Sequence, residues 1–180
     1  MKTFVTILSL IILSTYSCKA QRVVDVSNAQ NWLSGTSLSS YLKDTQNRFD
    51  EVIGTWKWEQ GNSSFEIEFI KITKHQLNNK LSTDLALGRY KYIENGVTVV
   101  DLLNTPINPD DFWADLIYMN ENEYHLILED TISQKTEEGT FILSNNDTTA
   151  TFVLKNTRGM KLSATNLDFS LPTELILTKQ

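Results

Sequence analysis

Between residues 53 and 72, apolar and polar side chains alternate with a period of two, which is the pattern of a half-buried β-strand. Trp56 and Trp58 share one face of a first strand, and the glycine-containing turn at residues 60–62 returns the chain into a second. The apolar face of the second strand has three members, Phe65, Ile67 and Phe69. The stretch therefore predicts the first hairpin of an antiparallel sheet.

The alternation slips after Phe69, because Ile70 and Ile72 fall on the face that carries the glutamates. A bulge or a strong bend would explain this slip, and such bends occur where a sheet curls into a barrel. Residues 74–84 are polar and are expected to form a loop.

The rest of the chain consists of short β-prone runs separated by turn residues. Asn95-Gly96 is a strong hairpin signal, because both central positions of a type I′ turn need positive φ. Pro106 and Pro109 exclude residues 103–111 from a central strand. Further strands are predicted at residues 85–93, 97–102, 112–119, 123–132, 138–143, 148–155, 160–164 and 173–178. An all-β antiparallel meander of about nine to ten strands, closed into a barrel or left as a curled sheet, is therefore expected.

The N-terminus has the pattern of an export signal. Lys2 supplies a positive start, and the apolar run at residues 4–13 is too short for a membrane span. A signal peptidase could cut after Ala20, or a lipoprotein peptidase could cut before Cys18 and leave a lipid on that cysteine. Residues 1–20 are therefore expected to be a signal peptide, and the protein to be a lipoprotein of the outer membrane or periplasm, or otherwise secreted.

Residues 21–40 are rich in Ser and Asn and are expected to form a flexible tether, which leaves residues 41–180 as a single domain. In the lead-in at residues 41–52, Asp44 is predicted to cap a short helix. Cys18 is the single cysteine, so the domain must be stabilised by its core and not by disulfides.

Charge and composition exclude several classes of function. The formal net charge is −6, and the densest basic stretch, residues 71–80, has three lysines spread over ten residues. Phosphate binding needs clustered Lys and Arg, so nucleic-acid binding is not expected. Catalytic zinc usually has three protein ligands, which His75, His125 and an N-terminal cysteine do not supply. No metal and no other cofactor is expected.

Candidate catalytic groups are sparse. The sequence has no Gly-x-Ser-x-Gly motif and no thiol in the folded part. Glu66 and Glu68 would lie about 6.5 Å apart along a strand, a spacing that a glycosidase could use. A solvated outer face of the sheet explains the same pair more simply. No enzymatic activity is therefore expected, and an envelope hydrolase that uses these two glutamates is a remote alternative.

Aromatic residues on the strands are the feature that most favours a function. A barrel of this size can hold one small apolar molecule, for which an aromatic lining is suitable. The candidate lining residues are Trp56, Trp58, Arg89, Tyr90 and Tyr92. The predicted role is binding of a small apolar ligand or of a partner at the cell envelope. The alternative is a structural or interaction module whose barrel is filled by its own side chains.

Residues 49–60, FDEVIGTWKWEQ, resemble the opening of the calycin superfamily, which contains the lipocalins and the fatty-acid-binding proteins. The matching features are the Gly-x-Trp at residues 54–56 and Phe49 before it. The resemblance implies a barrel in which the tryptophan plugs one end and an Arg or Lys from near the last strands packs across it. The last predicted strand has no arginine, so Lys179 or Arg158 would have to take that place.

The chain as a whole resembles a family of uncharacterised exported proteins of Bacteroidota, a domain of unknown function. The resemblance implies an exported protein and no particular reaction. It is carried by five short motifs, Ser-Cys-Lys-Ala-Gln at 17–21, Tyr-Leu-Lys-Asp-Thr at 41–45, Gly-Thr-Trp at 54–56, Gly-Arg-Tyr at 88–90 and Asn-Gly at 95–96.

Overall fold

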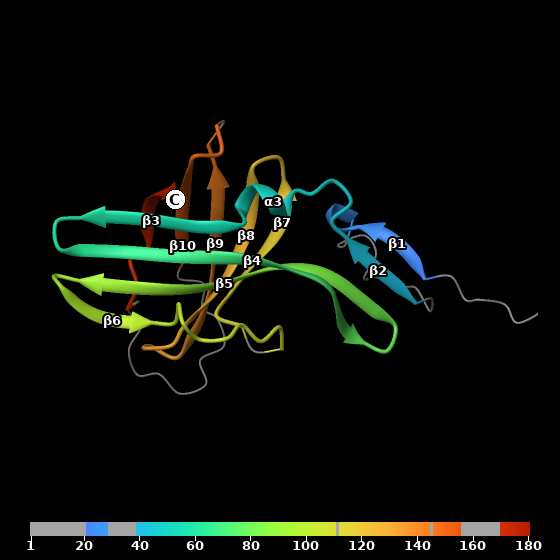
Figure 1. Ribbon diagram of the computed structural model, residues 1–180, viewed down its shortest axis with the longest axis horizontal. Helices are drawn as coiled ribbons and strands as arrows, with labels where there is room; N and C mark the ends of the chain where they lie inside the picture. Colours follow the sequence, from blue (N-terminus) through green and yellow to red (C-terminus); the bar gives the residue numbers. More distant parts are fainter. Residues whose placement is uncertain (1–20, 29–38, 111, 145, 156–169) are drawn as a thin grey trace, which may run out of the picture.

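The computed structural model describes residues 21–28, 39–110, 112–144, 146–155 and 170–180, and strands make up most of them (Figure 1). The all-β prediction is confirmed. In chain order the elements are β1 (Arg22–Asp25), η1 (Val26–Asn28), β2 (Ser40–Lys43), α3 (Phe49–Val52), β3 (Gly54–Gln60), β4 (Ser63–Asn78), β5 (Leu81–Glu94), β6 (Val97–Asp101), β7 (Ala114–Asn120), β8 (Glu123–Asp130), β9 (Lys135–Leu143), β10 (Thr149–Lys155) and β11 (Glu174–Lys179). The predicted strand at residues 160–164 lies outside the described residues.

Eight of these strands close into a barrel, in the order β3-β4-β5-β7-β8-β9-β10-β11, and β11 pairs back with β3. The neighbours around this circle are antiparallel. Because the barrel is closed, each of these strands pairs with a neighbour on both sides. A closed barrel has no exposed strand edge that could pair with another molecule. Of the two shapes that the sequence left open, the closed barrel is therefore the one that forms.

β5 extends beyond the barrel and carries a second, smaller layer of structure. One edge of β5 pairs with β4, and its other edge pairs in turn with β2, β7 and β6. β1 adds to β2 in parallel, so that β1 and β2 lie beside the barrel with the far end of the β4–β5 hairpin (Figure 1). The first part of the expected tether is thus ordered, because β2 offers it a strand edge. Residues 29–38 lie outside the described residues.

The loop predicted at residues 74–84 is wrong, because β4 runs to Asn78 and β5 begins at Leu81. The bulge expected after Phe69 lies further along, where the register shifts between Ile72 and His75. Lys74 sits in this shift with a φ of 54°. The end of this hairpin is held by backbone pairing between mostly polar residues. Because these residues do not alternate between apolar and polar, hydrophobic periodicity could not predict the strands here.

Aromatic side chains fill the inside of the barrel. Trp56 packs edge-on against Phe141 with ring centroids 5.2 Å apart. Phe65 lies 5.1 Å from Phe152 and 6.0 Å from Tyr90, measured between ring centroids. Aromatic pairs at such distances contribute about 0.5–1.5 kcal/mol beyond the area that they bury. The interior is thus a packed core along the described strands.

Close strand packing explains a glycine on the inner face of β9. A Cβ built on Gly139 would lie 1.9 Å from the carbonyl oxygen of Val153 on β10. We expect Gly139→Ala to lower the free energy of unfolding by about 1–3 kcal/mol, because the two strands must separate to admit the methyl group. Urea denaturation followed by circular dichroism measures this loss. Thr140→Ala, one residue away on the outer face, is the control, and an equal loss in both variants would contradict the steric explanation.

Candidate functional site

The aromatic residues predicted to line a ligand cavity belong mostly to the core. Trp56 and Tyr90 are fully buried, and Tyr92 is 8% exposed. Trp58 packs against this core from a partly buried position. Burial raises the pKa of Tyr90 to about 12, and its hydroxyl donates to the carbonyl of Glu129 at 2.7 Å. These side chains hold the barrel together, and their role in ligand binding stays a prediction.

Arg89 lies on the other side of β5 from its neighbour Tyr90. Its Nε is 2.7 Å from Glu68 Oε2, and its Nη1 donates to the carbonyl of Thr105 at 3.1 Å. Glu66 and Glu68 share the outer face of β4, with Glu66 opposite Lys91. Both glutamates thus stand beside cations on the outside of the sheet, an arrangement that fits a solvated charged face.

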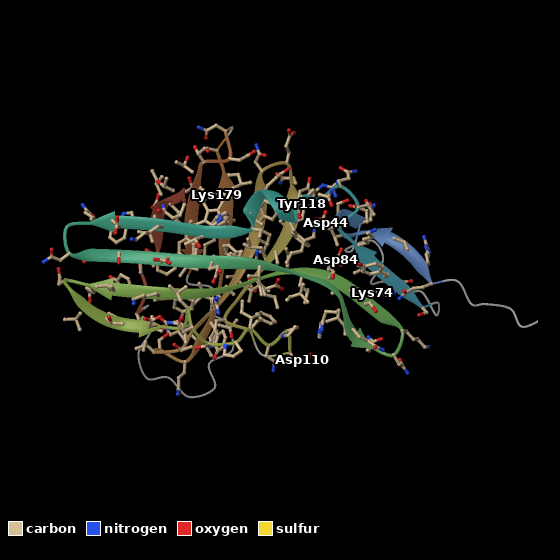
Figure 2. The ribbon with its side chains drawn as sticks, viewed as in Figure 1. Asp44, Lys74, Asp84, Asp110, Tyr118 and Lys179 are labelled. Atoms are coloured by element: carbon tan, nitrogen blue, oxygen red, sulfur yellow. The ribbon has the colours of Figure 1, made fainter. Side chains whose placement is uncertain are left out.

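Lys179 packs across Trp56, as the calycin resemblance implies. Its Nζ lies 5.2 Å from the centroid of the Trp56 ring and donates to the carbonyl of Glu51 at 2.6 Å (Figure 2). Trp56 in turn donates from Nε1 to the carbonyl of Val52 at 2.7 Å. The other candidate, Arg158, lies outside the described residues. These contacts fasten α3 over one mouth of the barrel.

The start of α3 is held by Asp44. Its carboxylate accepts the backbone N–H groups of Arg48 at 2.9 Å and Phe49 at 3.0 Å. The N-cap position itself is occupied by Arg48, so Asp44 holds the helix from outside and is not the capping residue that the sequence predicted. Lys71 on β4 adds an ion pair at 3.0 Å. Because Asp44 is 2% exposed, these bonds form in a shielded setting and fix the position of the helix.

Asp84 fastens the N-terminal strands to the long hairpin in the same way (Figure 2). Its carboxylate accepts the hydroxyl of Tyr41 at 2.5 Å, the N–H of Asp44 at 2.9 Å and the N–H of Lys74 at 2.8 Å. Burial, together with the Asp84 carboxylate, raises the pKa of Tyr41 to about 12, so this hydroxyl stays a donor at neutral pH.

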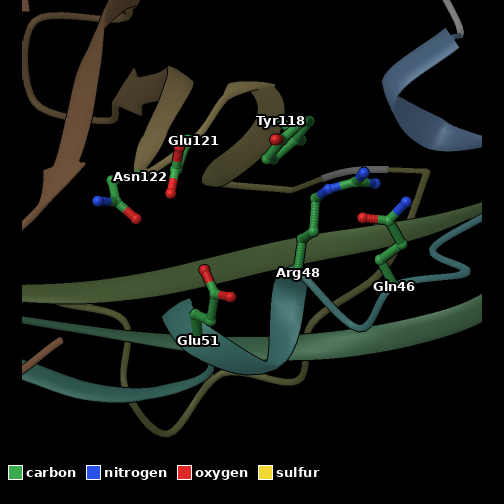
Figure 3. A pocket seen from close by; sticks show the side chains of 6 residues that line it. All are labelled: Gln46, Arg48, Glu51, Tyr118, Glu121 and Asn122. Carbon is green, nitrogen blue, oxygen red and sulfur yellow. The ribbon is translucent and has the colours of Figure 1, made fainter. Parts of the chain in front are cut away.

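A polar pocket of about 350 Å³, which we call the mouth pocket, lies between the α3 region and the β7–β8 turn (Figure 3). Its volume falls in the range of small-molecule sites. One wall comes from α3 and the chain that leads into it, and the other comes from the end of β7 and the turn that follows. The lining residues are Gln46, Arg48, Glu51, Tyr118, Glu121 and Asn122.

Arg48 is held in one orientation within the mouth pocket. Its Nη1 lies 2.6 Å from Asp25 Oδ1, and its guanidinium carbon lies 4.5 Å from the centroid of the Tyr118 ring. Burial alone would raise the pKa of Asp25, but hydrogen bonds from Ser27, Thr45 and Arg48 outweigh it and lower that pKa. The N-terminal strand β1 therefore contributes a fixed counter-charge to the pocket.

The two walls are joined by Tyr124. Its hydroxyl donates to the carbonyl of Arg48 at 2.7 Å and approaches Glu51 Oε2 at 3.3 Å. Burial raises the pKa of this hydroxyl, and the Glu51 carboxylate adds to the rise, so it remains a donor. Across the pocket, the carbonyl of Asn122 accepts the N–H of Leu143 at 2.8 Å, which fixes the β7–β8 turn. A pocket built this way is preorganised for binding.

Sequence reasoning missed the residues of the mouth pocket. Arg48, Tyr118 and Glu121 belong to no motif, and about seventy positions separate the two walls along the chain. The available signal was Asp44, which predicted a short helix in the lead-in and lies just before α3, where the chain crosses the barrel mouth.

Comparison with known proteins places the chain. A family model described as "Family of unknown function (DUF6705)" matches residues 1–180. The chain belongs to this family. No curated protein and no solved structure matches it. In this DUF6705 chain, none of the helices among the described residues is long and apolar enough to cross a membrane. The same residues contain no group of three or more His, Cys, Asp or Glu placed to hold a metal ion.

Proposed function

We propose that this DUF6705 protein is an exported, non-enzymatic binding domain, anchored at the cell envelope through a lipid on Cys18, and that it binds a small polar molecule in the mouth pocket. The observation that carries the proposal is the preorganisation of that pocket. Arg48 is held by both Asp25 and Tyr118, and Glu51 lies beside the Tyr124 hydroxyl. Polar side chains held in this way can select a ligand with little loss of conformational entropy.

The charges of the mouth pocket define the class of ligand. Glu51 and Glu121 are exposed carboxylates on opposite walls, and the guanidinium of Arg48 is already neutralised by Asp25. The pocket therefore has an excess of negative charge, which repels phosphates and carboxylates. Neutral or cationic molecules that carry hydroxyl or amino donors fit it, because each carboxylate accepts several hydrogen bonds.

The filled interior supports a second candidate function. An apolar ligand inside the barrel would have to displace Trp56 or Tyr90, which are packed among other rings. Removing such contacts without replacement costs several kcal/mol. The packing therefore favours an interaction module with a filled core over a carrier of apolar molecules, and in that case the mouth pocket would receive a polar segment of a partner.

Native mass spectrometry of the full protein, purified from the envelope of its own host, tests the proposal. We expect a co-purifying polar molecule on the wild type and at least a tenfold loss of its occupancy in the Glu51→Gln/Glu121→Gln double variant. At ligand concentrations well below the Kd, such a loss corresponds to about 1.4 kcal/mol of binding free energy, which is close to the contribution of one hydrogen bond to a charged group. The intact mass of the same sample shows whether Cys18 carries a lipid.

Glu174→Gln is the matched control for this experiment, because Glu174 is an exposed carboxylate on β11 outside the mouth pocket. We expect the Glu174→Gln variant to carry the co-purifying molecule in the same proportion as the wild type. A wild-type protein that carries no molecule, or a double variant that keeps its molecule, would rule out the mouth pocket as the binding site.

A further inference from the structure

A second cavity, of about 80 Å³, lies where the N-terminal strands meet the barrel. Residues from η1, β2, α3, β5 and β7 surround it, and most of its wall is aliphatic or aromatic. The apolar wall includes Val26, Leu42, Phe49 and Leu116. Tyr118 borders both this cavity and the mouth pocket, so the two spaces are neighbours with different linings.

Asp115 is the unusual member of this wall. Asp115 is 9% exposed, and its Oδ1 is buried with no hydrogen-bond partner among the described residues. Burial raises the pKa of Asp115 to about 6. The backbone N–H of Leu116 lowers this pKa, but by less than burial raises it. A buried acceptor without a donor is costly, and a group of this kind in a cavity is a candidate for binding.

The second carboxylate in the wall is already satisfied. Asp84 uses its oxygens for three hydrogen bonds within the protein, so it has no role as a receptor here. Thr83 also lines the cavity, and its hydroxyl donates to the carbonyl of Asp84 at 2.9 Å. Its oxygen lone pairs are therefore left to accept a hydrogen bond. The residues that line the cavity thus include two acceptors, Asp115 and Thr83, among mostly apolar neighbours.

From these features we propose that the cavity binds an ammonium group on a short alkyl chain, with the ammonium at the carboxylate of Asp115 and the alkyl carbons against Leu42 and Leu116. An ammonium brings three N–H donors and a positive charge, which is what an unpaired buried carboxylate lacks. A bare metal cation fits less well, because hard cations need about six oxygen ligands and this wall is mostly carbon. The volume is on the order of two or three water molecules, which suits an ammonium with one or two carbons.

Two sources can present this group, a free alkylamine and the end of a lysine side chain on a partner. Ethylammonium and Nα-acetyl-lysine methylamide represent them, and ethanol is the neutral probe of matched size. Titration of the full protein followed by the NMR signals of the Leu42 and Leu116 methyl groups reports binding at the cavity itself. A ligand of three heavy atoms can bind with a Kd on the order of 1 mM at best.

We expect ethylammonium to give saturable shifts at both methyl groups, with ethanol at least tenfold weaker. Asp115→Asn keeps the shape of the side chain and should weaken ethylammonium at least tenfold, and Thr83→Val should weaken it several-fold. Glu121→Gln in the mouth pocket should leave it unchanged, which separates this site from the proposed function. Saturable shifts with the lysine derivative would identify a partner side chain as a source, whereas shifts with ethylammonium alone would identify a free amine.

Two results would overturn the proposal. One is the absence of saturable shifts up to roughly 100 mM ethylammonium, which would mean that solvent alone occupies the cavity. The other is equal affinity of the wild type and Asp115→Asn for ethylammonium, since the carboxylate would then contribute nothing to binding.

Discussion

Trp56→Ala is expected to lower the free energy of unfolding by about 3–5 kcal/mol, the range for a fully buried large aromatic side chain. The substitution removes the edge-on contact with Phe141 and the stacking of Lys179 over the indole ring. It also leaves the carbonyl of Val52, which accepts the indole N–H at 2.7 Å, without that donor. Chemical denaturation by urea, followed by far-ultraviolet circular dichroism, gives the change directly.

Trp58→Ala is the natural comparison, because Trp58 has the same side chain on the same strand but is partly exposed. Trp58→Ala should lower the free energy of unfolding by a smaller amount, about 1–2 kcal/mol, since this side chain buries less apolar surface when the protein folds. If Trp56→Ala cost no more than Trp58→Ala, the packed interior described above would be incorrect.

Asp115→Asn is expected to stabilise the protein at neutral pH by up to about 3 kcal/mol, an opposite sign to the effect of most core substitutions. The amide has the shape of the carboxyl group but carries no charge, so the cost of burying an unpaired carboxylate disappears. Thermal and urea denaturation of the ligand-free protein at pH 7 measure the gain. A buried group that destabilises the fold in this way is typical of a site kept for function.

The stabilisation by Asp115→Asn should depend on pH in a defined direction. The pKa of Asp115 is about 6 in the folded state, against 3.8 as its ordinary value. The folded protein therefore binds the proton more tightly than the unfolded chain does. Protonated Asp115 contributes fully to the free energy of unfolding of the wild type below pH 3.8, and this contribution is lost as the pH rises to about 6.

The variant has no such loss, so the stability difference between variant and wild type should grow across this window and level off above it. Other groups, such as Asp25 with its lowered pKa, titrate equally in both proteins and cancel in the difference. A difference that stays constant with pH would show that Asp115 is not buried as an unpaired acid.

The fold was largely predictable from local pattern, and the candidate sites were not. Alternation around Trp56, the Asn95-Gly96 turn and the proline-containing segment after β6 each have a short-range physical cause, and each corresponds to a feature of the structure. Asp115 shows the limit of such reasoning. It lies on the face of β7 that period two assigns to the outside, yet it is 9% exposed, and η1, β2 and α3 contribute residues to the cavity that it lines.

The mouth pocket shows the same limit from another side. The guanidinium carbon of Arg48 lies 4.5 Å from the centroid of the Tyr118 ring, although the two residues lie far apart in the chain. Hydrophobic period specifies which face of a strand is buried, but it carries no information about which distant segment lies above that face.

By itself, the sequence determined that the chain forms an antiparallel meander with aromatic side chains on its strands, because strand alternation and turn chemistry act over a few residues. Only the tertiary structure decided that the meander closes, that residues 22–25 add strand β1 and that Asp115 lies buried without a donor. Closure and burial depend on contacts between segments far apart in the chain, and the free energy of those contacts is set by three-dimensional packing and exclusion of water.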